Sequence, residues 1–345
     1  YPDFDPNRYR QYDPAERVNA AVTLGYEPGS TFKVITVAAA LNEGIVTPTQ
    51  EFFCENGGFQ VADHVINDNR PHGNLEIGQV IQKSSNICAA KIGMELKPAQ
   101  FHDYITKFGF GAKTRVGLPG EATGLVVPPD QWTRVDHATV TYGQGILASP
   151  LQVVAAINAI ANEGEWRPPY VVEYAEDESG GRHTEFRDDS GEVQVHFGQK
   201  APRRVIDASI ARILTRFMVS VTKRGGTAPK VAIPGYTIAG KTGTSQMYDP
   251  GLGRYSNTRF WASFVGFAPV AQPVLTILVV ITEPQRPDHY GSRAAAPVFR
   301  EIMQRALVLM DVPPETQSND VTRPATPEMT VDPATFEAIG MQDLD

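Results

Sequence analysis

The residues whose types and spacing most clearly permit chemistry are a serine and a lysine three positions apart. Ser30 and Lys33 stand in the string Ser-Thr-Phe-Lys, at the start of a predominantly apolar run over 34–41. Such a run predicts a helix buried on all sides, and residues three apart on a helix share a face. Lys33 can then reach the Ser30 hydroxyl, which needs an adjacent base to act as a nucleophile. Burial and the positive end of the helix dipole both favour the neutral lysine that a base requires.

The S-x-x-K spacing is weak evidence by itself, because it occurs by chance about once in a chain of this length. A second match, Ser220 to Lys223, lies at the end of another predicted helix, beside Gly225. The helix dipole at that end favours a protonated lysine. We therefore predict that the second match is a surface feature.

A second candidate is the polar triplet Ser84-Ser85-Asn86, which interrupts an otherwise apolar stretch. Three consecutive polar residues are unfavourable to bury without partners. One interpretation is a helix break that faces solvent. The other places the Ser84 hydroxyl and the Asn86 amide at the edge of a cleft, where they relay a proton and bind a substrate amide.

A third candidate is the string Lys241-Thr242-Gly243-Thr244 on a predicted strand. Hydroxyl residues alternating along a strand edge, with Gly243 removing one side chain, provide a lane for an extended peptide. The lysine and the threonine hydroxyls suit a carboxylate. The alternative is an exposed edge strand that lysine protects from aggregation, although a specified four-residue string occurs by chance only about once in 10⁵ positions.

The helices and strands that must position these residues can be predicted from the spacing of apolar residues and from the residues that begin and end such elements. Helices are predicted for the buried run after Lys33, for the stretch that contains Ser84, and where apolar residues recur every three or four positions. Alternating apolar and polar segments between Gly and Asp predict short strands in 167–199. Runs of helices and strands without βαβ alternation indicate an α+β protein with an antiparallel sheet flanked by helices. The predicted helices are 34–41, 75–93, 99–108, 150–161, a helix capped by Asp207, and 294–309; the later strands are 236–245, 260–268 and 274–282.

Composition excludes several classes of function. The 345 residues carry a formal net charge of −8, so no basic field is available to hold nucleic acid. The seven histidines are dispersed and the two cysteines lack C-x-x-C spacing, so we expect no metal and no cofactor. No stretch has the roughly 20 apolar residues that a membrane span needs. Because the chain begins at Tyr1 without an initiator Met, we interpret it as a fragment whose anchor or export signal lies outside it.

The order S-x-x-K, S-x-N, K-T-G is the signature of serine enzymes that react with penicillin by acyl transfer. The chain resembles the transpeptidase domain of class B penicillin-binding proteins over most of 1–310. Within the family it is most similar to the division-specific septal peptidoglycan synthase, on the KTGT and AAAPVF strings, although the elongation-type synthase shares most of the motifs. The strings that carry the resemblance occur in family order: EPGSTFK, IQKSSN, GLPGEATG, YGQGI, GGTA, KTGT and YGSRAAAPVFREIM.

The resemblance implies a role for each motif residue in D,D-transpeptidation. Ser30 is the acylated nucleophile and Lys33 its base, and Ser84 passes the proton to the leaving D-alanine nitrogen. Asn86 binds the donor amide. The terminal carboxylate is held by the third motif, and the oxyanion hole is formed by two backbone N–H groups. These last two sets are Lys241, Thr242, Gly243 and Thr244 for the carboxylate, and Ser30 and Thr244 for the oxyanion.

The resemblance also implies the architecture and the setting. The expected fold is an antiparallel five-stranded sheet flanked by helices, with an all-helical subdomain that carries Ser84. Residues 1–310 form the transpeptidase domain, and the Pro-, Thr- and acid-rich tail 311–345 is expected to be disordered. Expected partners are peptidoglycan stem peptides, β-lactam antibiotics, a membrane glycosyltransferase and division proteins. The expected location is the periplasmic, extracytoplasmic face of the bacterial inner membrane.

Several alternatives stay open on sequence alone. The middle motif is Ser-Ser-Asn rather than Ser-Asp-Asn, and no E-x-x-L-N loop positions a deacylating water, which weighs against a serine β-lactamase. A D,D-carboxypeptidase differs only in whether water or an amine attacks the acyl-enzyme. A β-lactam sensor acylates without turnover, and a wall-binding module does not need Ser30. Cys54 and Cys88 are either a disulfide pair or two small buried side chains.

Overall fold

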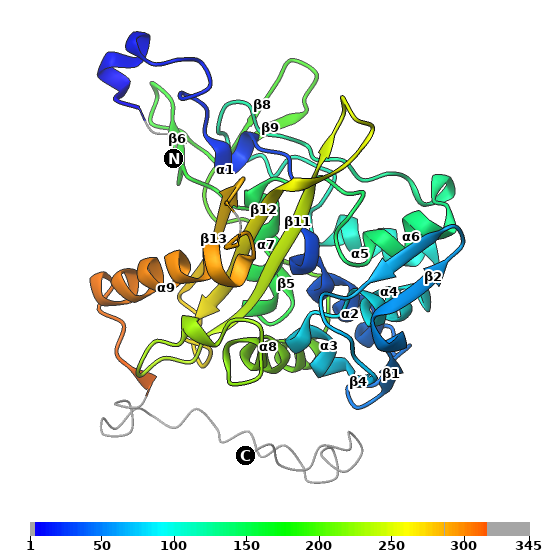
Figure 1. Ribbon diagram of the computed structural model, residues 1–345. Helices are drawn as coiled ribbons and strands as arrows, with labels where there is room; N and C mark the ends of the chain where they lie inside the picture. The colour runs from blue at the N-terminus through cyan, green and yellow to red at the C-terminus, as the bar shows by residue number, and fades with distance from the viewer. Residues whose placement is uncertain (1–3, 286, 316–345) are drawn as a thin grey trace.

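The computed structural model describes residues 4–285 and 287–315. Its central sheet consists of β11 (Ala239–Asp249), β12 (Arg254–Ala268) and β13 (Leu275–Thr282), all antiparallel and in that order. The sheet lies between helices (Figure 1). On one face Phe299 of α9 (Gly291–Leu309) stacks edge-on against Phe264, and on the other Thr276 donates a hydrogen bond to Asn158 of α7 (Pro150–Ala161). The α+β fold with helices on both sides of an antiparallel sheet is confirmed.

A second region lies beside the edge strand β11 and contains the predicted buried helix (Figure 1). This helix is α2 (Lys33–Asn42), in which every residue except the last is buried. Two pairs of short strands also belong to this region, so the expectation of an all-helical subdomain is wrong. The other helices are α3 (Ile77–Lys83), α4 (Asn86–Met94), α5 (Pro98–Lys107) and α6 (Arg134–Val140); the strand pairs are β1 (Glu51–Phe53) with β4 (Asn74–Glu76) and β2 (Gly58–Val61) with β3 (His64–Asn67).

The helix expected over 75–93 is broken at Ser84. This residue has φ 63° and ψ 39°, a left-handed conformation that cannot continue a helix. Ser85 then accepts a hydrogen bond from the Cys88 amide and caps the start of α4. Helix α3 therefore ends at Lys83 and α4 begins at Asn86, as separate elements.

Residues 165–204 form short two-stranded pairs, as the alternating pattern predicts. In the described part of the chain none of these strands pairs with the central sheet, so the expected count of five strands is not confirmed. Strands of two to four residues have too few ladder hydrogen bonds to extend a sheet far. The pairs are β5 (Glu165–Trp166) with β10 (Arg203–Arg204), β6 (Ala175–Glu176) with β7 (Arg182–His183), and β8 (Glu185–Arg187) with β9 (Val193–His196).

The chain after α9 returns to the base of β11. The Tyr236 hydroxyl donates to the Val312 carbonyl at 2.6 Å, and the Thr237 amide donates to the Glu315 carboxylate. Residues 316–345, which hold most of the tail expected to be disordered, lie outside the described residues. Among the helices that are described, none is long and apolar enough to cross a bilayer. The remaining helix, α8 (Ala208–Thr222), follows Asp207 and packs against α3 and β11.

Candidate active site

Ser30 and Lys33 meet as their spacing predicts. Ser30 lies in a single turn of 3-10 helix, η2 (Gly29–Phe32), that runs directly into α2 at Lys33. The Lys33 side chain is completely buried, and its Nζ lies 2.8 Å from Ser30 Oγ. The nucleophile candidate therefore stands at the mouth of a helix whose burial fixes the lysine beside it.

The polar triplet reaches the same lysine from the other side. Lys33 Nζ lies 2.6 Å from the Ser84 carbonyl oxygen, 3.2 Å from Ser84 Oγ and 2.7 Å from Asn86 Oδ1. The Asn86 amide nitrogen donates instead to the Asn67 carbonyl at 2.9 Å, which fixes the orientation of the amide. Of the two interpretations of the triplet, the geometry supports the one that places Ser84 and Asn86 at a cleft edge.

Lys241 brings the third motif into the cluster. It is also completely buried, and its Nζ donates to Ser84 Oγ at 2.8 Å and to the Thr242 carbonyl at 3.0 Å. The Ser84 hydroxyl thus contacts both lysine amines. Ser84 therefore links Lys33, which lies 51 positions before it in the chain, to Lys241, which lies 157 positions after it.

Burial sets the charge of the two lysines. Desolvation lowers the pKa of Lys33 to about 7, while the negative charge of Asp68 acts in the opposite direction. The pKa of Lys241 is held well below its usual value by desolvation and by the nearby Lys33 amine. Near neutral pH a substantial fraction of Lys33 is therefore the free base that proton abstraction requires.

Neutral Lys33 has a defined direction for its lone pair. A neutral amine has two N–H donors, and two of its neighbours, the Ser84 carbonyl and Asn86 Oδ1, can only accept. When those two oxygens take the two hydrogens, the lone pair is left for a hydroxyl. The Ser30 hydroxyl at 2.8 Å is the nearer of the two hydroxyls available.

The strand β11 approaches the nucleophile turn closely enough to exclude side chains. A Cβ built on Gly243 would lie 2.2 Å from Ser263 Oγ and 3.0 Å from the Pro28 carbonyl oxygen. A Cβ on Gly29 would lie 3.1 Å from the Thr244 carbonyl oxygen. Glycine at both positions therefore brings the backbone of Thr244 beside that of Ser30, where the sequence predicts an oxyanion hole.

Two threonine hydroxyls line the lane along β11. Thr242 Oγ1 lies 3.1 Å from the Thr227 hydroxyl, which belongs to the GGTA string after α8. Thr244 Oγ1 accepts a hydrogen bond from the Gly291 amide, the first residue of α9, at 3.0 Å. Both hydroxyls are thus held by neighbouring elements, as a lane for a peptide terminus would need.

The second S-x-x-K match takes no part in this cluster. The Ser220 hydroxyl donates to the Phe217 carbonyl within its own helix at 2.6 Å. Lys223 is exposed and follows the last residue of α8. Its position at the helix end agrees with the prediction from the dipole.

Sequence reasoning missed Glu27, which precedes the nucleophile turn. Its carboxylate accepts hydrogen bonds from the Gly145 amide at 2.9 Å and the Tyr255 hydroxyl at 2.7 Å, and burial raises its pKa. The neighbouring Gly143 lies against Gly29, whose amide donates to the Gly143 carbonyl. The sequence signal that could have identified Glu27 is the pair of strings EPGS and YGQG, because the contact between Gly29 and Gly143 joins these two strings directly.

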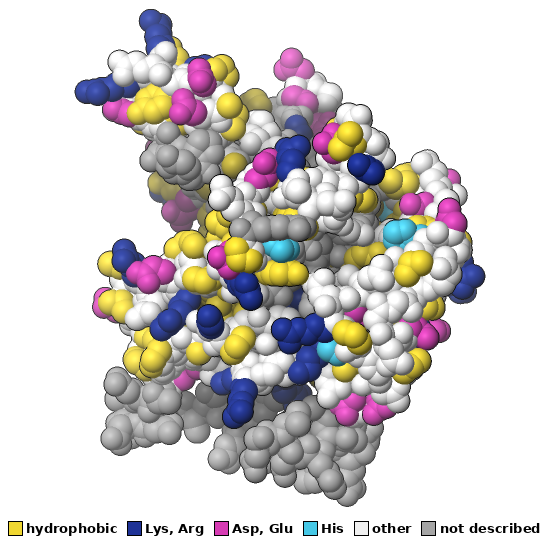
Figure 2. Space-filling view, in the orientation of Figure 1, with side chains coloured by type: hydrophobic (Ala, Val, Ile, Leu, Met, Phe, Trp, Pro, Cys, Tyr) yellow, Lys and Arg dark blue, Asp and Glu magenta, His cyan; other side chains and the backbone are white. Residues whose placement is uncertain are grey.

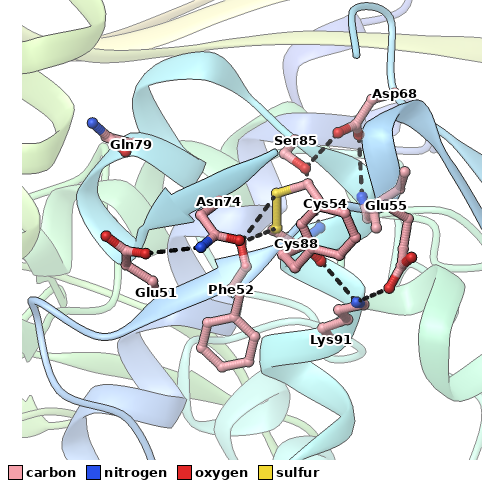
Figure 3. Close-up of a disulfide and its surroundings, with 12 residues drawn as sticks. Glu51, Phe52, Cys54, Glu55, Asp68, Asn74, Gln79, Ser85, Cys88 and Lys91 are labelled. Atoms are coloured by element: carbon pink, nitrogen blue, oxygen red, sulfur yellow. Dashed lines mark hydrogen bonds and ion pairs between the residues drawn. A yellow bond between two sulfur atoms is a disulfide. The ribbon is translucent and has the colours of Figure 1, made fainter. Parts of the chain in front are cut away.

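Sequence reasoning also missed Asp68, and it left the state of the cysteines open. Cys54 and Cys88 form a disulfide with 5.2 Å between their Cα atoms (Figure 3). The bond ties the segment before β2 to α4, two residues beyond Asn86. Asp68 accepts a hydrogen bond from the hydroxyl of Ser85, the residue that caps α4 (Figure 3).

Comparison with known proteins places this geometry in a family. The family described as "Penicillin binding protein transpeptidase domain" matches residues 1–304. The chain is 32% identical to a probable peptidoglycan D,D-transpeptidase PenA of Neisseria flavescens, over 91% of this chain and 72% of that protein. It is 32% identical to the peptidoglycan D,D-transpeptidase FtsI of Escherichia coli K12, over 91% of this chain and 49% of that protein. The chain therefore spans about half the length of the second relative.

Solved structures agree. The transpeptidase domain of Burkholderia pseudomallei penicillin-binding protein 3 is 35% identical with a TM-score of 0.74, covering 86% of this chain and 83% of that one. Penicillin-binding protein 3 of Mycobacterium tuberculosis, complexed with ampicillin, is 29% identical with a TM-score of 0.78, covering 92% and 69%. The chain belongs to the family of penicillin-binding protein transpeptidase domains.

Proposed function

We propose that the chain is the catalytic domain of a peptidoglycan D,D-transpeptidase that forms an acyl-enzyme on Ser30. The observation that carries the proposal is the continuous set of contacts from Ser30 Oγ to Lys33 Nζ, to Ser84 Oγ and to Lys241 Nζ. Three motifs from distant parts of the chain thereby supply a nucleophile, a base and a second hydroxyl. A serine nucleophile needs an adjacent base within hydrogen-bond reach, and here a third group contacts that base.

The first half of the reaction follows from these contacts. Neutral Lys33 accepts the Ser30 proton as Ser30 Oγ attacks the carbonyl of the penultimate D-alanine. The backbone N–H groups of Ser30 and Thr244 stabilise the oxyanion, a kind of contribution that in well-studied serine enzymes is worth about 10² to 10³ in rate. The C–N bond then breaks as Ser84 delivers its proton to the departing D-alanine nitrogen and takes in return the proton held by Lys33, which becomes neutral again. The products are an ester on Ser30 and free D-alanine.

The second half transfers the acyl group. An acceptor amine attacks the ester carbonyl, its extra proton returns through Lys33, and Ser30 leaves as the hydroxyl. Asn86 binds the donor amide. The donor's terminal carboxylate, before it departs, is held by Lys241 and by the hydroxyls of Thr242 and Thr244, with Gly243 leaving room for the peptide.

Charge around the lane also suits an anionic terminus. Lys and Arg side chains gather on the face seen in Figure 2, over the part where α3 and α8 lie in Figure 1. Lys83, the last residue of α3, donates to the Gly225 carbonyl at 2.8 Å in the loop after α8, where Lys223 and Arg224 are exposed. This loop continues to Thr227, which contacts Thr242. Cations at the entrance favour the approach of a carboxylate.

Septal wall synthesis is the proposed setting, with stem peptides as substrates and β-lactams as covalent inhibitors. Relatives with names such as FtsI and PenA, and the ampicillin and aztreonam complexes of the M. tuberculosis protein, support this assignment. The proposed location is the periplasmic side of the inner membrane. A membrane glycosyltransferase and division proteins are the proposed partners of the whole protein.

Intact-mass spectrometry after brief exposure to benzylpenicillin tests the proposal. We expect a one-to-one adduct in the wild type and in a Ser220→Ala control, and none in Ser30→Ala. An adduct that clears within seconds would indicate a β-lactamase, and no adduct in folded wild type would leave only a binding module. A second assay supplies a D-Ala-D-Ala thioester donor and a D-amino acid acceptor, and the ratio of transfer product to hydrolysis product separates a transpeptidase from a carboxypeptidase. A stable penicillin adduct without any turnover of the donor would favour a sensor.

A further inference from the structure

Asp68 lies in the segment that follows β3, directly beside the N-terminus of α4. Its carboxylate accepts three hydrogen bonds from this helix start: the Ser85 hydroxyl at 2.6 Å, the Asn86 amide at 2.5 Å and the Ile87 amide at 3.1 Å (Figure 3). Hydrogen bonds to a charged acceptor are stronger than neutral ones. One carboxylate therefore holds the turn that carries the second motif.

These contacts fix the turn from which Ser84 and Asn86 reach Lys33. The Ser85 hydroxyl gives its hydrogen to Asp68 and takes a hydrogen bond from the Cys88 amide, so both its roles are occupied. With its backbone amide anchored on Asp68, Asn86 presents Oδ1 to Lys33. Asp68 thus acts on the reacting groups through Ser85 and Asn86 rather than by touching Ser30.

Asp68 also supplies negative charge to a cluster that contains two buried amines. Lys33 faces Ser30 of η2, Ser84 of the turn, Asn86 of α4 and, through the Ser84 hydroxyl, the Lys241 amine of β11. The charge of Asp68 raises the pKa of Lys33, against the effect of burial. The charge of Lys33 in turn helps to lower the pKa of the Lys241 amine, because like charges disfavour each other.

We propose that Asp68 is a positioning residue of the acylation site, and that it supplies from another segment the carboxylate that the Ser-Ser-Asn form of the second motif lacks at Ser85. The proposal rests on the function proposed for Ser30 and Lys33. It assigns Asp68 two effects, one on the geometry of the turn and one on the proton affinity of the base. These effects can be separated by experiment.

The first experiment compares the wild type with Asp68→Asn in single-turnover acylation by benzylpenicillin between pH 5.5 and 8.5. We expect the limiting rate to fall about 10- to 100-fold, the cost of a small misplacement of reacting groups. We also expect the acid limb of the profile to move to lower pH, because Lys33 loses the charge that favours its protonated form. Asp63→Asn is the matched control, because this substitution removes the same charge. Asp63 is exposed at the tip of the hairpin formed by β2 and β3, which Asp68 follows.

The second experiment moves the carboxylate. In the double variant Asp68→Asn, Ser85→Asp, the charge returns to the middle of the second motif, and we expect the acid limb to return toward its wild-type position. An Asp68→Asn variant with the wild-type rate and profile would overturn the proposal. The proposal would also be overturned if Asp68→Asn acylated more slowly but kept the wild-type pH profile, and if the double variant did not restore the rate. That pattern is expected of a purely structural contact. If Asp68→Asn fails to fold, judged by circular dichroism, the double variant alone decides between these outcomes.

A readout without acylation keeps this test separate from the proposed function. The titration of Lys33, followed by NMR of lysine labelled with ¹³C at Cε, moves to lower pH in Asp68→Asn if the proposal holds. An unmoved titration would contradict it. Absence of any penicillin adduct in the wild type would instead remove the proposed function and leave the NMR comparison intact.

Discussion

The buried lysine at the nucleophile makes a quantitative prediction about pH. With the pKa of Lys33 lowered to about 7 by burial, the neutral fraction is about one half at pH 7 and nearly complete at pH 8.5. The acylation rate should then rise only about twofold between these two values if neutral Lys33 is the base. Below the midpoint it should fall about tenfold per pH unit, because each unit reduces the free base tenfold.

An unperturbed lysine would behave differently over the same interval. With the ordinary lysine pKa of 10.5, the neutral fraction would increase about 30-fold between pH 7 and pH 8.5, because the amine would still be almost fully protonated. The two cases differ by roughly an order of magnitude, far more than the scatter of a rate measurement. A lysine that stays charged could not serve as the base near neutral pH.

Stopped-flow acylation with a chromogenic cephalosporin, under single-turnover conditions, measures this ratio directly. The uncatalysed hydrolysis of the cephalosporin is subtracted at each pH, and thermal melting at the same pH values excludes partial unfolding as a cause. Lys33→Arg serves as a control, since its guanidinium remains charged throughout and should leave acylation slow and without the limb near pH 7. A wild-type rate that climbs about tenfold per pH unit up to pH 9 would refute the reasoning.

Two further predictions concern stability. Gly143→Ala should lower the free energy of unfolding, measured in urea, by about 2 to 4 kcal/mol, because Gly143 has φ +82° and a Cβ would lie 2.3 Å from the Gly29 carbonyl oxygen. The control Gly145→Ala should cost only about 1 kcal/mol, because Gly145 has φ +73° but open space around the added Cβ. Equal losses of stability in the two variants would contradict the packing argument. Replacing Cys54 and Cys88 by Ala should cost about 3 to 4 kcal/mol, since the bond closes a separation of 34 residues. Dithiothreitol should destabilise the wild type but not this double variant, and a shared response to the reductant would show that the bond is not formed.

The three candidate motifs could be found in the sequence because each depends on local spacing. Ser30 and Lys33 are brought together by one turn of helix, and the apolar run that follows fixes the burial of that turn. The strand that carries Lys241 was expected over 236–245, and β11 spans Ala239–Asp249. Short-range periodicity determines such elements, and it is visible in a single sequence.

Contacts between distant segments could not be predicted in the same way. Asp68 lies 17 residues before Ser85, in a polar segment whose composition gives no reason to prefer it over Asp63. The break at Ser84 goes with the cap of α4 and with hydrogen bonds between Ser84 and two lysines from other elements. Periodicity contains no information about such distant contacts, and it therefore predicts one long helix. The count of five strands is not confirmed for the described residues, and a count of this kind is hard to predict because tertiary packing, rather than local pattern, determines which strands pair.

The hydrogen bond from the Gly291 amide to Thr244 Oγ1 orients the hydroxyl before any ligand arrives. An amide N–H can only donate, so it occupies one of the two lone pairs of the hydroxyl oxygen and leaves the hydroxyl hydrogen to point elsewhere. In the function proposed above, that hydrogen is the one a substrate carboxylate would accept. The junction between α9 and β11 thereby prepares the Thr244 hydroxyl to donate, so less ordering is needed when a ligand binds.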